Sequence, residues 1–355
     1  MPGFGPGGAQ SRIIALVNGL GRGFRHIIVA LNENLGAADR LDRSADVQCV
    51  PQRVSANPLR ALGELIALIK NQRPDLVLTY NWGSIEAVIA ARLSRICPVI
   101  HTEDGFGPDE ATQQKTRRVI ARRLILRCAY RVIAPSKRLY TIMLNEWRLP
   151  AGVATYIPNG VDTKFFLPDE RRQGSANEVV IGTAGQLRPE KRQDDLIALC
   201  AQLQRSIPVR LRIAGEGPER KALEECARLS QLGSRVEFLG QVRDLRDFYH
   251  SLDLFALTSS TEQMPISVLE AMASGLSVIS TDVGDVKQMV SAENAQFIVP
   301  KGRALEDALR ILAQDVFQRE AIGASNRKRC VEAFSLDTMI ETYRNMYRQA
   351  IQVKK

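Results

Sequence analysis

Short apolar runs rich in β-branched residues alternate with longer helix-like stretches, and this alternation constrains the fold more than any other feature. Such a pattern is typical of parallel sheets built from right-handed βαβ units. The strand-like runs are at 25–32, 74–80, 97–102, 131–136 and 154–160, then at 178–187, 209–217, 235–240, 253–260 and 276–284. The helix-like stretches between them include 59–70, 84–95, 111–129, 191–205, 218–232 and 265–274.

The length and a polar joint predict how these units are divided. A chain of 355 residues commonly forms two domains. Residues 166–178 are polar and contain Gly, Ser and Pro, as linkers often do. We therefore expect an α/β protein with two Rossmann-like parallel-sheet domains, residues 1–165 and 166–336, followed by a helix in 337–355.

The first domain lacks one expected element. A Rossmann domain normally has a strand before its glycine-rich turn, but only six residues precede Gly7, too few for a buried strand. We predict that the first strand of this domain is missing and that the natural or ancestral start lies upstream. A complete strand ahead of Gly7 would contradict this prediction.

The composition, 45% hydrophobic and 25% charged, is ordinary for a soluble globular protein. No run approaches the ~18 consecutive apolar residues of a membrane-spanning helix, and the first residues do not form a signal peptide. Six scattered cysteines without a C-x-x-C pair favour reduced thiols in a cytoplasm. Only three histidines and no D-x-D pair are present, which argues against a local metal site.

The excess positive charge lies entirely in the first half. Residues 1–168 contain 22 basic and 13 acidic residues, whereas residues 169–355 contain 26 of each. This asymmetry predicts an anionic partner for the first half: a membrane surface, a phosphorylated substrate or a nucleic acid. No recognised nucleic-acid-binding motif accompanies it, so we expect no nucleic-acid partner.

Several candidate binding residues follow predicted strands, where ligands bind in open α/β sheets. Arg188 and Lys191 precede a predicted helix and could clamp a diphosphate near the positive end of that helix. His101 ends a predicted strand and could donate to a sugar hydroxyl. The Gly7-Gly8 pair could let backbone N–H groups meet a phosphate. Taken singly, each also fits a plain turn or a structural histidine.

The stretch "TEQMPISVLE" at 261–270 carries two carboxylates. Pro265 suits the first position of a helix, so Glu262 lies in the loop before it and Glu270 about a turn and a half inside. Glu262 could simply complement the helix dipole, and Glu270 could be solvated. Glu270, however, lies in a mostly apolar segment, where an unpartnered carboxylate would be costly. A carboxylate can also accept from two neighbouring sugar hydroxyls at once.

Five ordered segments together resemble the family 4 glycosyltransferases, also known as group 1 glycosyltransferases, which have the GT-B fold. The last segment contains the family's E-x7-E signature followed by A-M-A-x-G. A single E-x7-E is a weak signal. Five segments in the family's order and spacing favour a glycosyltransferase over ordinary turns and structural residues. The segments are "YIPNGVDTKFF" (156–166), "TAGQLRPEK" (183–191), "RIAGEGPER" (212–220), "VEFLGQV" (236–242) and "SSTEQMPISVLEAMASGLSVISTDVGDV" (259–286).

The resemblance implies retaining transfer of a sugar from a UDP- or GDP-activated donor, without a metal or other cofactor, in a cleft between the domains. Glu270 would bind the ribose, and Glu262 would contact the donor sugar. Arg188 and Lys191 would hold the diphosphate as the glycosidic bond breaks. His101 matches the position of a histidine that contacts the donor sugar.

The resemblance also assigns backbone contacts to the donor. The backbone of Gln263, Met264 and Pro265 would cradle the sugar, Gly8 would approach the phosphates from the first domain, and Val242 would lie at the base. The helix at about 337–353 would cross back onto the first domain.

The chain departs from the family pattern at a few positions. Gln186 stands where many members have an arginine, a role that Arg188 could take. The usual "GG" and later Glu after the signature are Gly284-Asp285 and Gln288. These differences and the missing strand leave open a non-catalytic or impaired member that binds a nucleotide-sugar or a membrane. A nucleotide-sugar 2-epimerase, which shares the two-domain shape, fits the signature less well.

From Lys115 to Arg131 there are seven basic residues and no acidic one. Because they spread around a helix at 100° per residue, we do not expect a simple amphipathic membrane anchor. We expect some of them to face anionic lipid or a lipid-diphosphate acceptor, although an ordinary basic surface fits as well. Together these features predict a cytoplasmic transferase, peripheral at the inner face of the membrane, that adds a sugar to a lipid-linked glycan during surface polysaccharide or lipopolysaccharide assembly.

Overall fold

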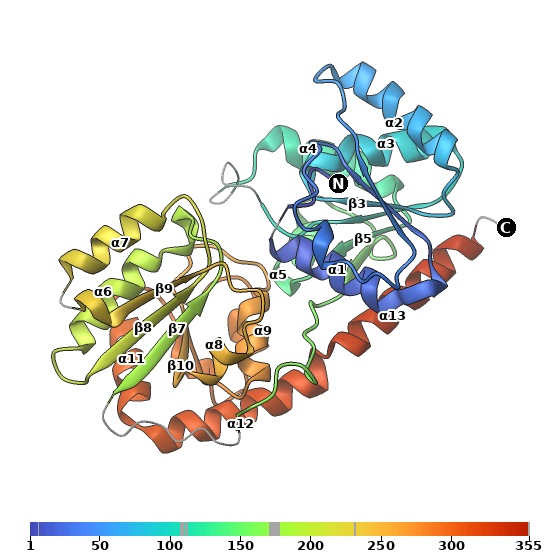
Figure 1. Cartoon of the computed structure of the whole chain (residues 1–355). Helices are drawn as coiled ribbons and strands as arrows, with labels where there is room; N and C mark the ends of the chain where they lie inside the picture. The colour runs from blue at the N-terminus through green and yellow to red at the C-terminus, as the bar shows by residue number, and fades with distance from the viewer. Residues whose placement is uncertain (6, 107–109, 111–112, 170–177, 231, 354–355) are drawn as a thin grey trace. The chain divides into compact units, whose positions relative to one another are not determined.

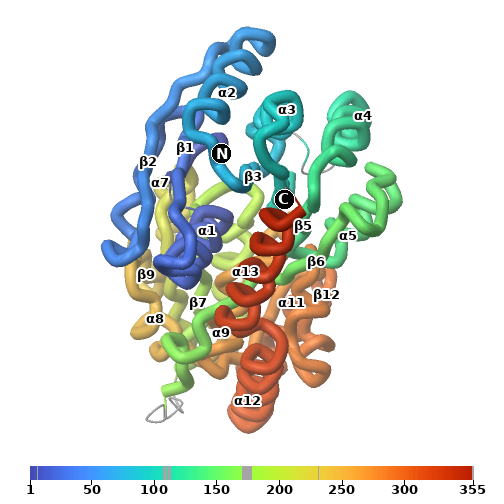
Figure 2. Tube along the Cα trace, turned by 90° about the vertical axis from the view of Figure 1, so that its right-hand side faces the viewer, coloured from blue at the N-terminus to red at the C-terminus, as the bar shows by residue number. Residues whose placement is uncertain are grey.

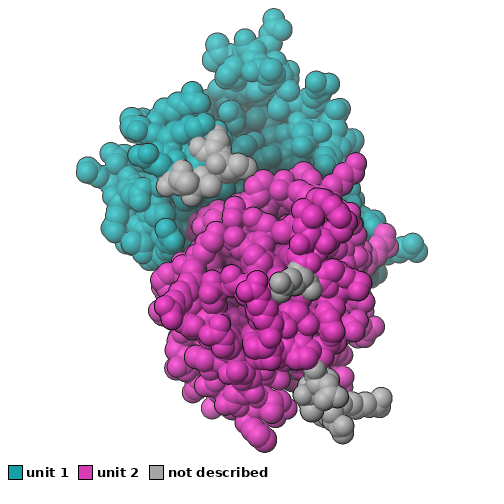
Figure 3. All heavy atoms as spheres, turned by 90° about the vertical axis from the view of Figure 1, so that its left-hand side faces the viewer, with its two compact units in different colours: residues 1–159, 337–355 teal, residues 160–336 magenta. Residues whose placement is uncertain are grey.

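The computed structural model describes residues 1–5, 7–106, 110, 113–169, 178–230 and 232–353 (Figure 1). The chain divides into two compact units, coloured separately in Figure 3. Unit 1 comprises Met1–Asn159 with Asp337–Lys355, and unit 2 comprises Gly160–Leu336. Part of the predicted linker, 170–177, and three residues of predicted helices, 111–112 and 231, lie outside the described residues.

Unit 2 is built on a parallel sheet whose described strands follow the order β12-β11-β10-β7-β8-β9. The order runs in opposite directions from the neighbouring pair β7 and β10, so the topological switch point lies between these two strands. The strands are β7 (Val179–Ala184), β8 (Val209–Ala214), β9 (Val236–Gly240), β10 (Leu254–Leu257), β11 (Val278–Thr281) and β12 (Ile298–Val299).

Helices cover both faces of the unit 2 sheet, as βαβ connections require. The central strand β10 is buried at all four residues, which explains its continuous apolar sequence "LFAL". The helices are α6 (Gln193–Leu203), α7 (Arg220–Leu229), α8 (Arg246–His250), α9 (Ile266–Ala273), α10 (Val286–Met289), α11 (Arg303–Gln314) and α12 (Val316–Ala333).

The described strands of unit 1 form two separate parallel sheets. One has the order β3-β4-β5-β6, with β3 (Val77–Tyr80), β4 (Val99–Thr102), β5 (Arg131–Ala134) and β6 (Ala154–Tyr156). The other pairs β1 (His26–Ala30) with β2 (Val47–Pro51). No strand is present in residues 1–5 and 7, so the complete strand ahead of Gly7 that would contradict our prediction is not found.

The helices of unit 1 lie on both sides of these strands, with α2 and α3 above and α1 and α13 below in the view of Figure 1. Figure 2 shows the N-terminus between β1 and β3. The helices are α1 (Gly8–Leu20), α2 (Pro58–Gln72), α3 (Ile85–Ser94), α4 (Thr116–Ile125), α5 (Lys137–Asn145) and α13 (Leu336–Gln352).

The last helix, α13, packs against the first, α1, although the two are separated by more than 300 residues. A Cβ on Gly19 would lie 2.2 Å from Cδ1 of Ile340, so the absence of a side chain there allows close helix packing. The guanidinium of Arg344 also donates to the carbonyl of Gly19 at 3.1 Å. These contacts explain why Asp337–Lys355 belongs to unit 1.

Each of the ten predicted apolar runs contains one strand. Two strands were not predicted. β2 is half exposed and its sequence "VQCVP" lacks a strong apolar pattern, and β12 has only two residues. The predicted helix at 111–129 is shorter in its described part, because α4 begins at Thr116 and a 3₁₀ turn follows at Leu126–Cys128.

Candidate active site

The loops after β7 and β10 bring a cation and a carboxylate together at the switch point of unit 2. Lys191 Nζ lies 2.6 Å from Glu262 Oε1. The hydroxyl of Ser259 donates to the same Glu262 oxygen at 2.7 Å. The Glu262 side chain is 10% exposed and that of Lys191 is 26% exposed, so both remain within reach of a ligand. Two of the four predicted catalytic residues therefore form one ion pair.

Further hydrogen bonds fix the two loops against each other. The backbone N–H of Ser260 donates to the carbonyl of Glu190 at 2.8 Å. The hydroxyl of Thr258 donates to the carbonyl of Arg192, also at 2.8 Å. Because both contacts end on backbone carbonyls of the loop after β7, the distance between Lys191 and Glu262 does not depend on two long side chains alone.

Arg188 lies at the outer side of the same loop. Its side chain is 40% exposed, and Nε lies 3.1 Å from Oε1 of Glu190. A pair this exposed contributes little to stability, so the guanidinium can be redirected to a ligand at low cost. Arg188 and Lys191 thus both follow β7, where the sequence placed them. Their role as a diphosphate clamp stays a prediction.

The turn after β11 supports the loop from Glu262 to Pro265. The N–H of Asp285 donates to the carbonyl of Gln263 at 2.9 Å. Gly284 has a φ of 55°, and a Cβ there would lie 2.4 Å from the Gln263 oxygen. Only glycine fits this turn without displacing the loop. Asp285 stands where the family pattern given above has a second glycine. The close approach to the carbonyl of Gln263 is made by Gly284, which is present.

Pro265 forms the boundary between this loop and α9. It is the N-cap residue, with an extended backbone, and α9 begins at Ile266, one residue later than the first-turn position expected from the sequence. Met264 and Pro265 are buried. Met264 belongs to the apolar core of unit 2, so within 263–265 only the backbone and Gln263 remain available to a ligand.

Glu270 lies inside α9 and has a buried partner that the sequence did not indicate. The hydroxyl of Tyr249, from α8, donates to Glu270 Oε2 at 2.7 Å. Tyr249 is fully buried and packs edge-on against Phe166 and Phe248. Burial, followed by the neighbouring Glu270 carboxylate, raises the pKa of Tyr249 well above its ordinary value. Tyr249 therefore remains a hydrogen-bond donor and fixes one oxygen of Glu270.

The turns after β8 and β9 form the other side of the switch point. The N–H of Gly215 donates to the carbonyl of Gly240 at 2.7 Å. A Cβ on Gly215 would lie 1.8 Å from the carbonyl oxygen of Gly185, so the turns after β7 and β8 are in close contact. Val242 follows β9, is partly buried and packs against the apolar core of unit 2.

In unit 1, Gly8 is the first residue of α1 and is exposed, with open space where a Cβ would project. One turn further along, Arg12 is 3% exposed and its Nη2 lies 2.6 Å from Asp104 Oδ1. Nη1 of Arg12 donates to Asn159 Oδ1 at 3.3 Å. Burial raises the pKa of Asp104, against the opposite effect of Arg12. This cluster lies at the carboxyl end of β4 and was not predicted.

His101, by contrast, is completely buried within β4. Its Nδ1 lies 2.9 Å from the hydroxyl of Thr79 on the neighbouring strand β3. Its Nε2 lies 3.7 Å from Glu103 Oε2. The ring therefore faces other side chains of unit 1, and Asp104 is the more accessible charged group at the end of this strand, with a side chain 16% exposed.

The basic residues of α4 fall into two groups. Arg122 is 1% exposed, and its Nη1 and Nη2 donate to the two oxygens of Glu110 at 3.1 and 3.0 Å. Trp82, Phe106 and Trp147 surround the Arg122 guanidinium, with ring centroids 5.0–5.3 Å away. The exposed side of α4 and the turn after it instead carries Arg117, Ile120, Leu124 and Arg127. One of the basic residues that the sequence analysis counted, Arg122, is therefore not on the surface but in an internal ion pair with Glu110.

Two family descriptions match the chain. The model for "Glycosyltransferase Family 4" matches residues 6–165, and that for "Glycosyl transferases group 1" matches residues 168–329. Together they span both units and include the loops that carry Lys191 and Glu262.

The chain belongs to the group 1 glycosyltransferases of family 4. It is 26% identical over 298 residues to the putative glycosyltransferase EpsF of Bacillus subtilis, which covers 79% of this chain and 75% of EpsF. It is 27% identical over 258 residues to the UDP-Gal:alpha-D-GlcNAc-diphosphoundecaprenol alpha-1,3-galactosyltransferase of Escherichia coli, covering 68% of this chain and 66% of that protein.

The fold of this glycosyltransferase is also similar to that of a solved structure. The structure of Anabaena Alr3699/HepE in complex with UDP-glucose superposes with a TM-score of 0.81 at 20% identity, covering 98% of each chain. The glycosyltransferase therefore has the two parallel-sheet α/β domains of the GT-B fold.

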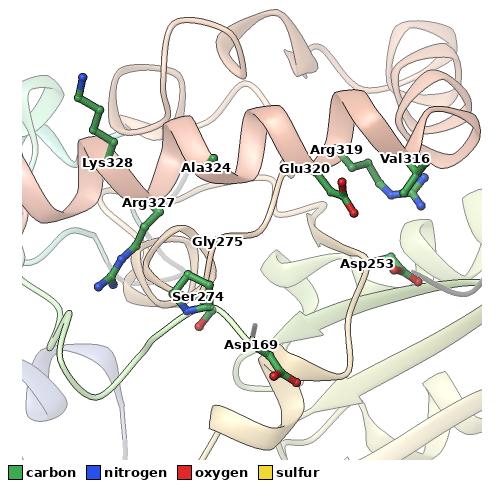
Figure 4. Close-up of a pocket in the computed structure, with 11 residues that line it drawn as sticks. Asp169, Asp253, Ser274, Gly275, Val316, Arg319, Glu320, Ala324, Arg327 and Lys328 are labelled. Carbon is green, nitrogen blue, oxygen red and sulfur yellow. The ribbon is translucent and has the colours of Figure 1, made fainter. Parts of the chain in front are cut away.

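A large pocket of this glycosyltransferase lies away from the predicted site residues. The pocket, about 460 Å³ in volume, lies between α12 and the end of α9. Figure 4 shows Arg319, Glu320 and Arg327 projecting from α12 toward it, with Asp253 nearby. Asp253 precedes β10 and accepts from the N–H of Val180 at the start of β7. This pocket is thus at the amino ends of the strands, opposite the edge where Lys191 and Glu262 meet.

The part of the chain that the structure describes has no helix long and apolar enough to cross a bilayer. Nor do its described His, Cys, Asp and Glu side chains form a group of three that could hold a metal ion.

Proposed function

We propose that this glycosyltransferase moves a sugar from a nucleoside-diphosphate sugar to a lipid-linked glycan, with retention of the anomeric configuration. The observation that carries the proposal is the ion pair between Lys191 and Glu262 at the switch point between β7 and β10. Ligands in open α/β sheets bind at this place, and the pair offers a cation for a phosphate beside a carboxylate for a sugar.

In the proposed mechanism, Lys191 and Arg188 stabilise the leaving diphosphate. Negative charge grows on this group as the bond to the sugar breaks, and fixed cations stabilise such charge more in the transition state than in the bound donor. Glu262 accepts hydrogen bonds from hydroxyls of the transferred sugar and orients its anomeric carbon. Glu270, held by Tyr249, accepts from the ribose hydroxyls.

We propose a UDP-sugar as the first donor class to test. The name of the Escherichia coli relative specifies UDP-Gal, and the Anabaena structure contains UDP-glucose. GDP-sugars remain the second class. Arg188 and Lys191 contact a diphosphate in either case, so the base would be distinguished by the turns around Gly240 and Val242.

We propose that the acceptor is linked to a lipid diphosphate, and that the exposed face of α4 contacts an anionic membrane. Ile120 and Leu124 are 50% and 58% exposed, and Arg117 and Arg127 flank them. Apolar side chains between arginines suit the interface of an anionic bilayer. Arg122 points to the opposite side of the helix, where it pairs with Glu110, and is not part of this face. This arrangement supports a peripheral location on the cytoplasmic side.

A hollow in unit 1 is the proposed entry point for the acceptor glycan. It has a volume of about 390 Å³ and lies at the carboxyl ends of β3 and β4. Trp82 and Phe106 line it together with Glu103 and Asp104. Sugar sites commonly combine aromatic surfaces with a few polar groups.

Donor binding and stereochemistry test the proposal. A thermal-shift screen of UDP- and GDP-sugars, followed by calorimetry, should identify a donor that raises the melting temperature. NMR of the product made from that donor should show the anomeric configuration of the donor. An inverted product would contradict retention. Donor binding without transfer or hydrolysis would support the second candidate, a non-catalytic nucleotide-sugar-binding member.

A further inference from the structure

One oxygen of Glu262 has two hydrogen-bond donors of different charge. Oε1 lies 2.6 Å from the ammonium Nζ of Lys191, which follows β7, and accepts from the hydroxyl of Ser259, which follows β10, at 2.7 Å. The other oxygen, Oε2, accepts no hydrogen bond from the residues that the structure describes. Because a carboxylate can accept hydrogen bonds at both oxygens, Oε2 is the atom available to a hydroxyl of the transferred sugar.

Ser259 holds Glu262 from a rigid position. The residue is completely buried, and its short side chain has one rotatable bond before the hydroxyl. Its carbonyl accepts a hydrogen bond from the hydroxyl of Thr281, the last residue of β11, at 2.6 Å. Lys191, by contrast, is 26% exposed and reaches Glu262 through a flexible four-carbon stem. The serine is therefore the more rigid of these two partners of Glu262.

Lys191 has a second partner in the proposed reaction, the diphosphate of the donor. Its ammonium is a compact charge, and such a charge binds phosphate oxygens well. Negative charge grows on the diphosphate as the bond to the sugar breaks, so the attraction between Lys191 and the diphosphate strengthens at that moment. The hold of Lys191 on Glu262 weakens as a result.

Ser259 does not take part in this competition. A hydroxyl has one hydrogen to donate, whereas an ammonium has three, and the hydroxyl of Ser259 donates to Glu262. The hydroxyl is also neutral, so a diphosphate attracts it much less than it attracts an ammonium. The hydrogen bond from Ser259 to Glu262 therefore persists while Lys191 is drawn toward the diphosphate.

We propose that Ser259 is a positioning residue for sugar transfer, which keeps Oε2 of Glu262 directed at the sugar while Lys191 turns to the leaving diphosphate. This role rests on the functions proposed above for Lys191 and Glu262. Thr281 supports Ser259 through its carbonyl and thereby connects the loop to the end of β11. The contacts from Thr281 through Ser259 to Glu262 thus join a buried strand end to the carboxylate that orients the sugar.

Hydrolysis of the donor tests this role without a known acceptor. The full chain is assayed with the UDP- or GDP-sugar that the thermal-shift screen selects, and calorimetry measures the affinity for free UDP or GDP. Ser259→Ala should lower kcat about 10-fold, because a hydrogen bond to a charged group is lost. The affinity for the free nucleotide should not change, since Ser259 contacts the carboxylate assigned to the sugar.

Ser277→Ala is the matched control. Ser277 is as buried as Ser259 but lies just before β11, at the opposite edge of the sheet. Its hydroxyl has no hydrogen-bond partner among the described residues. This substitution also removes one buried hydroxyl, and it should change neither kcat nor the affinity for the nucleotide.

A double-mutant cycle separates positioning from a general structural effect. In a chain that carries Glu262→Ala, Ser259→Ala should cause no further loss of kcat, because the carboxylate that Ser259 holds is already absent. A purely structural contact would lower kcat in both backgrounds. Thr281→Val removes the hydroxyl that supports Ser259 and should lower kcat about 3-fold. It provides the test if Ser259→Ala does not fold.

Three results would overturn this role: an unchanged kcat in Ser259→Ala, a loss of nucleotide affinity as large as the loss of kcat, or a full further loss in the Glu262→Ala chain. Each of them would leave the proposed transfer reaction intact. If the wild-type chain neither transfers nor hydrolyses any donor, the transfer reaction itself is excluded, and the role of Ser259 with it.

Discussion

Lys191 Nζ and Glu262 Oε1 lie 2.6 Å apart, on loops that follow two neighbouring strands but are 71 residues apart in the chain. The pair joins the residue assigned to the leaving diphosphate to the residue assigned to the transferred sugar. A donor bound here would therefore have its breaking bond beside this pair. This arrangement allows the roles of individual side chains to be separated experimentally.

The two signature carboxylates should have different effects. Glu262→Gln should lower kcat by about 10²–10³, the usual loss when one electrostatic contact to the transition state is removed, while nucleotide affinity stays within a few-fold. Glu270→Gln should weaken nucleotide binding about 10-fold or more, because a charged hydrogen-bond acceptor is lost. Calorimetry with the free nucleotide and a transfer assay separate the effects.

Glu320→Gln provides the matched control, since Glu320 is exposed and lines the pocket at the amino ends of the strands. Glu320→Gln should change neither kcat nor the affinity for the nucleotide. Equal behaviour of the Glu262 and Glu270 variants would rule out the division of roles.

Tyr249 should act through Glu270. Tyr249→Phe keeps the ring packed against Phe166 and Phe248 but removes the hydrogen bond to Glu270. One such bond contributes about 0.5–1.5 kcal/mol, so we expect nucleotide affinity to fall about 2- to 10-fold with kcat at saturating donor unchanged. Measuring kcat and KM separately checks this. A change in Tm without a change in KM would show that Tyr249 is only structural.

Gly284 should be required for the loop geometry. Gly284→Ala places a Cβ 2.4 Å from the carbonyl oxygen of Gln263, at a φ of 55°. Strain of this kind costs on the order of 1–3 kcal/mol, and relief would displace the loop that carries Glu262. We expect a loss of transfer larger than the loss of thermal stability. Gly152→Ala, where a Cβ would meet nothing, is the control and should leave activity unchanged.

The exposed face of α4 should mediate membrane contact. The double change Ile120→Glu and Leu124→Glu should reduce cosedimentation with vesicles containing anionic lipid at least several-fold, because it replaces apolar contacts with repelled charges. Leu229→Glu, on an exposed leucine of α7 in unit 2, is the control. Transfer to a water-soluble acceptor should be unaffected. Equal binding by both variants would show that this face does not contact lipid.

The sequence was sufficient for the ten strands that have apolar runs and for the loop and the helix that carry Glu262 and Glu270. Strand-like runs that are buried on both faces, such as "LFAL" in β10, have a strong local signal. Glu262 and Glu270 were separated correctly into a loop and a helix because Pro265 marks the boundary between them. These features depend on neighbouring residues, which a sequence pattern records.

Features that depend on distant contacts were not predicted. Tyr249 and Glu270 are 21 residues apart, and Arg12 pairs with Asp104 from another element. The basic stretch of α4 appeared uniform in the sequence, because nothing local indicates that Arg122 is enclosed by three aromatic rings and bonded to Glu110. Side-chain partners of this kind become visible only once the fold has placed them together.

Transfer of label from a nucleotide-sugar is the most direct test of the central claim. The wild-type protein and the Glu262→Gln variant would be incubated with tritiated UDP- and GDP-sugars and a lipid extract, and label in the organic phase would be counted. We predict that the wild-type protein transfers label from one donor and that the Glu262→Gln variant does so at least about 100-fold more slowly. Neither transfer nor hydrolysis of any donor by the folded wild-type protein would contradict the account.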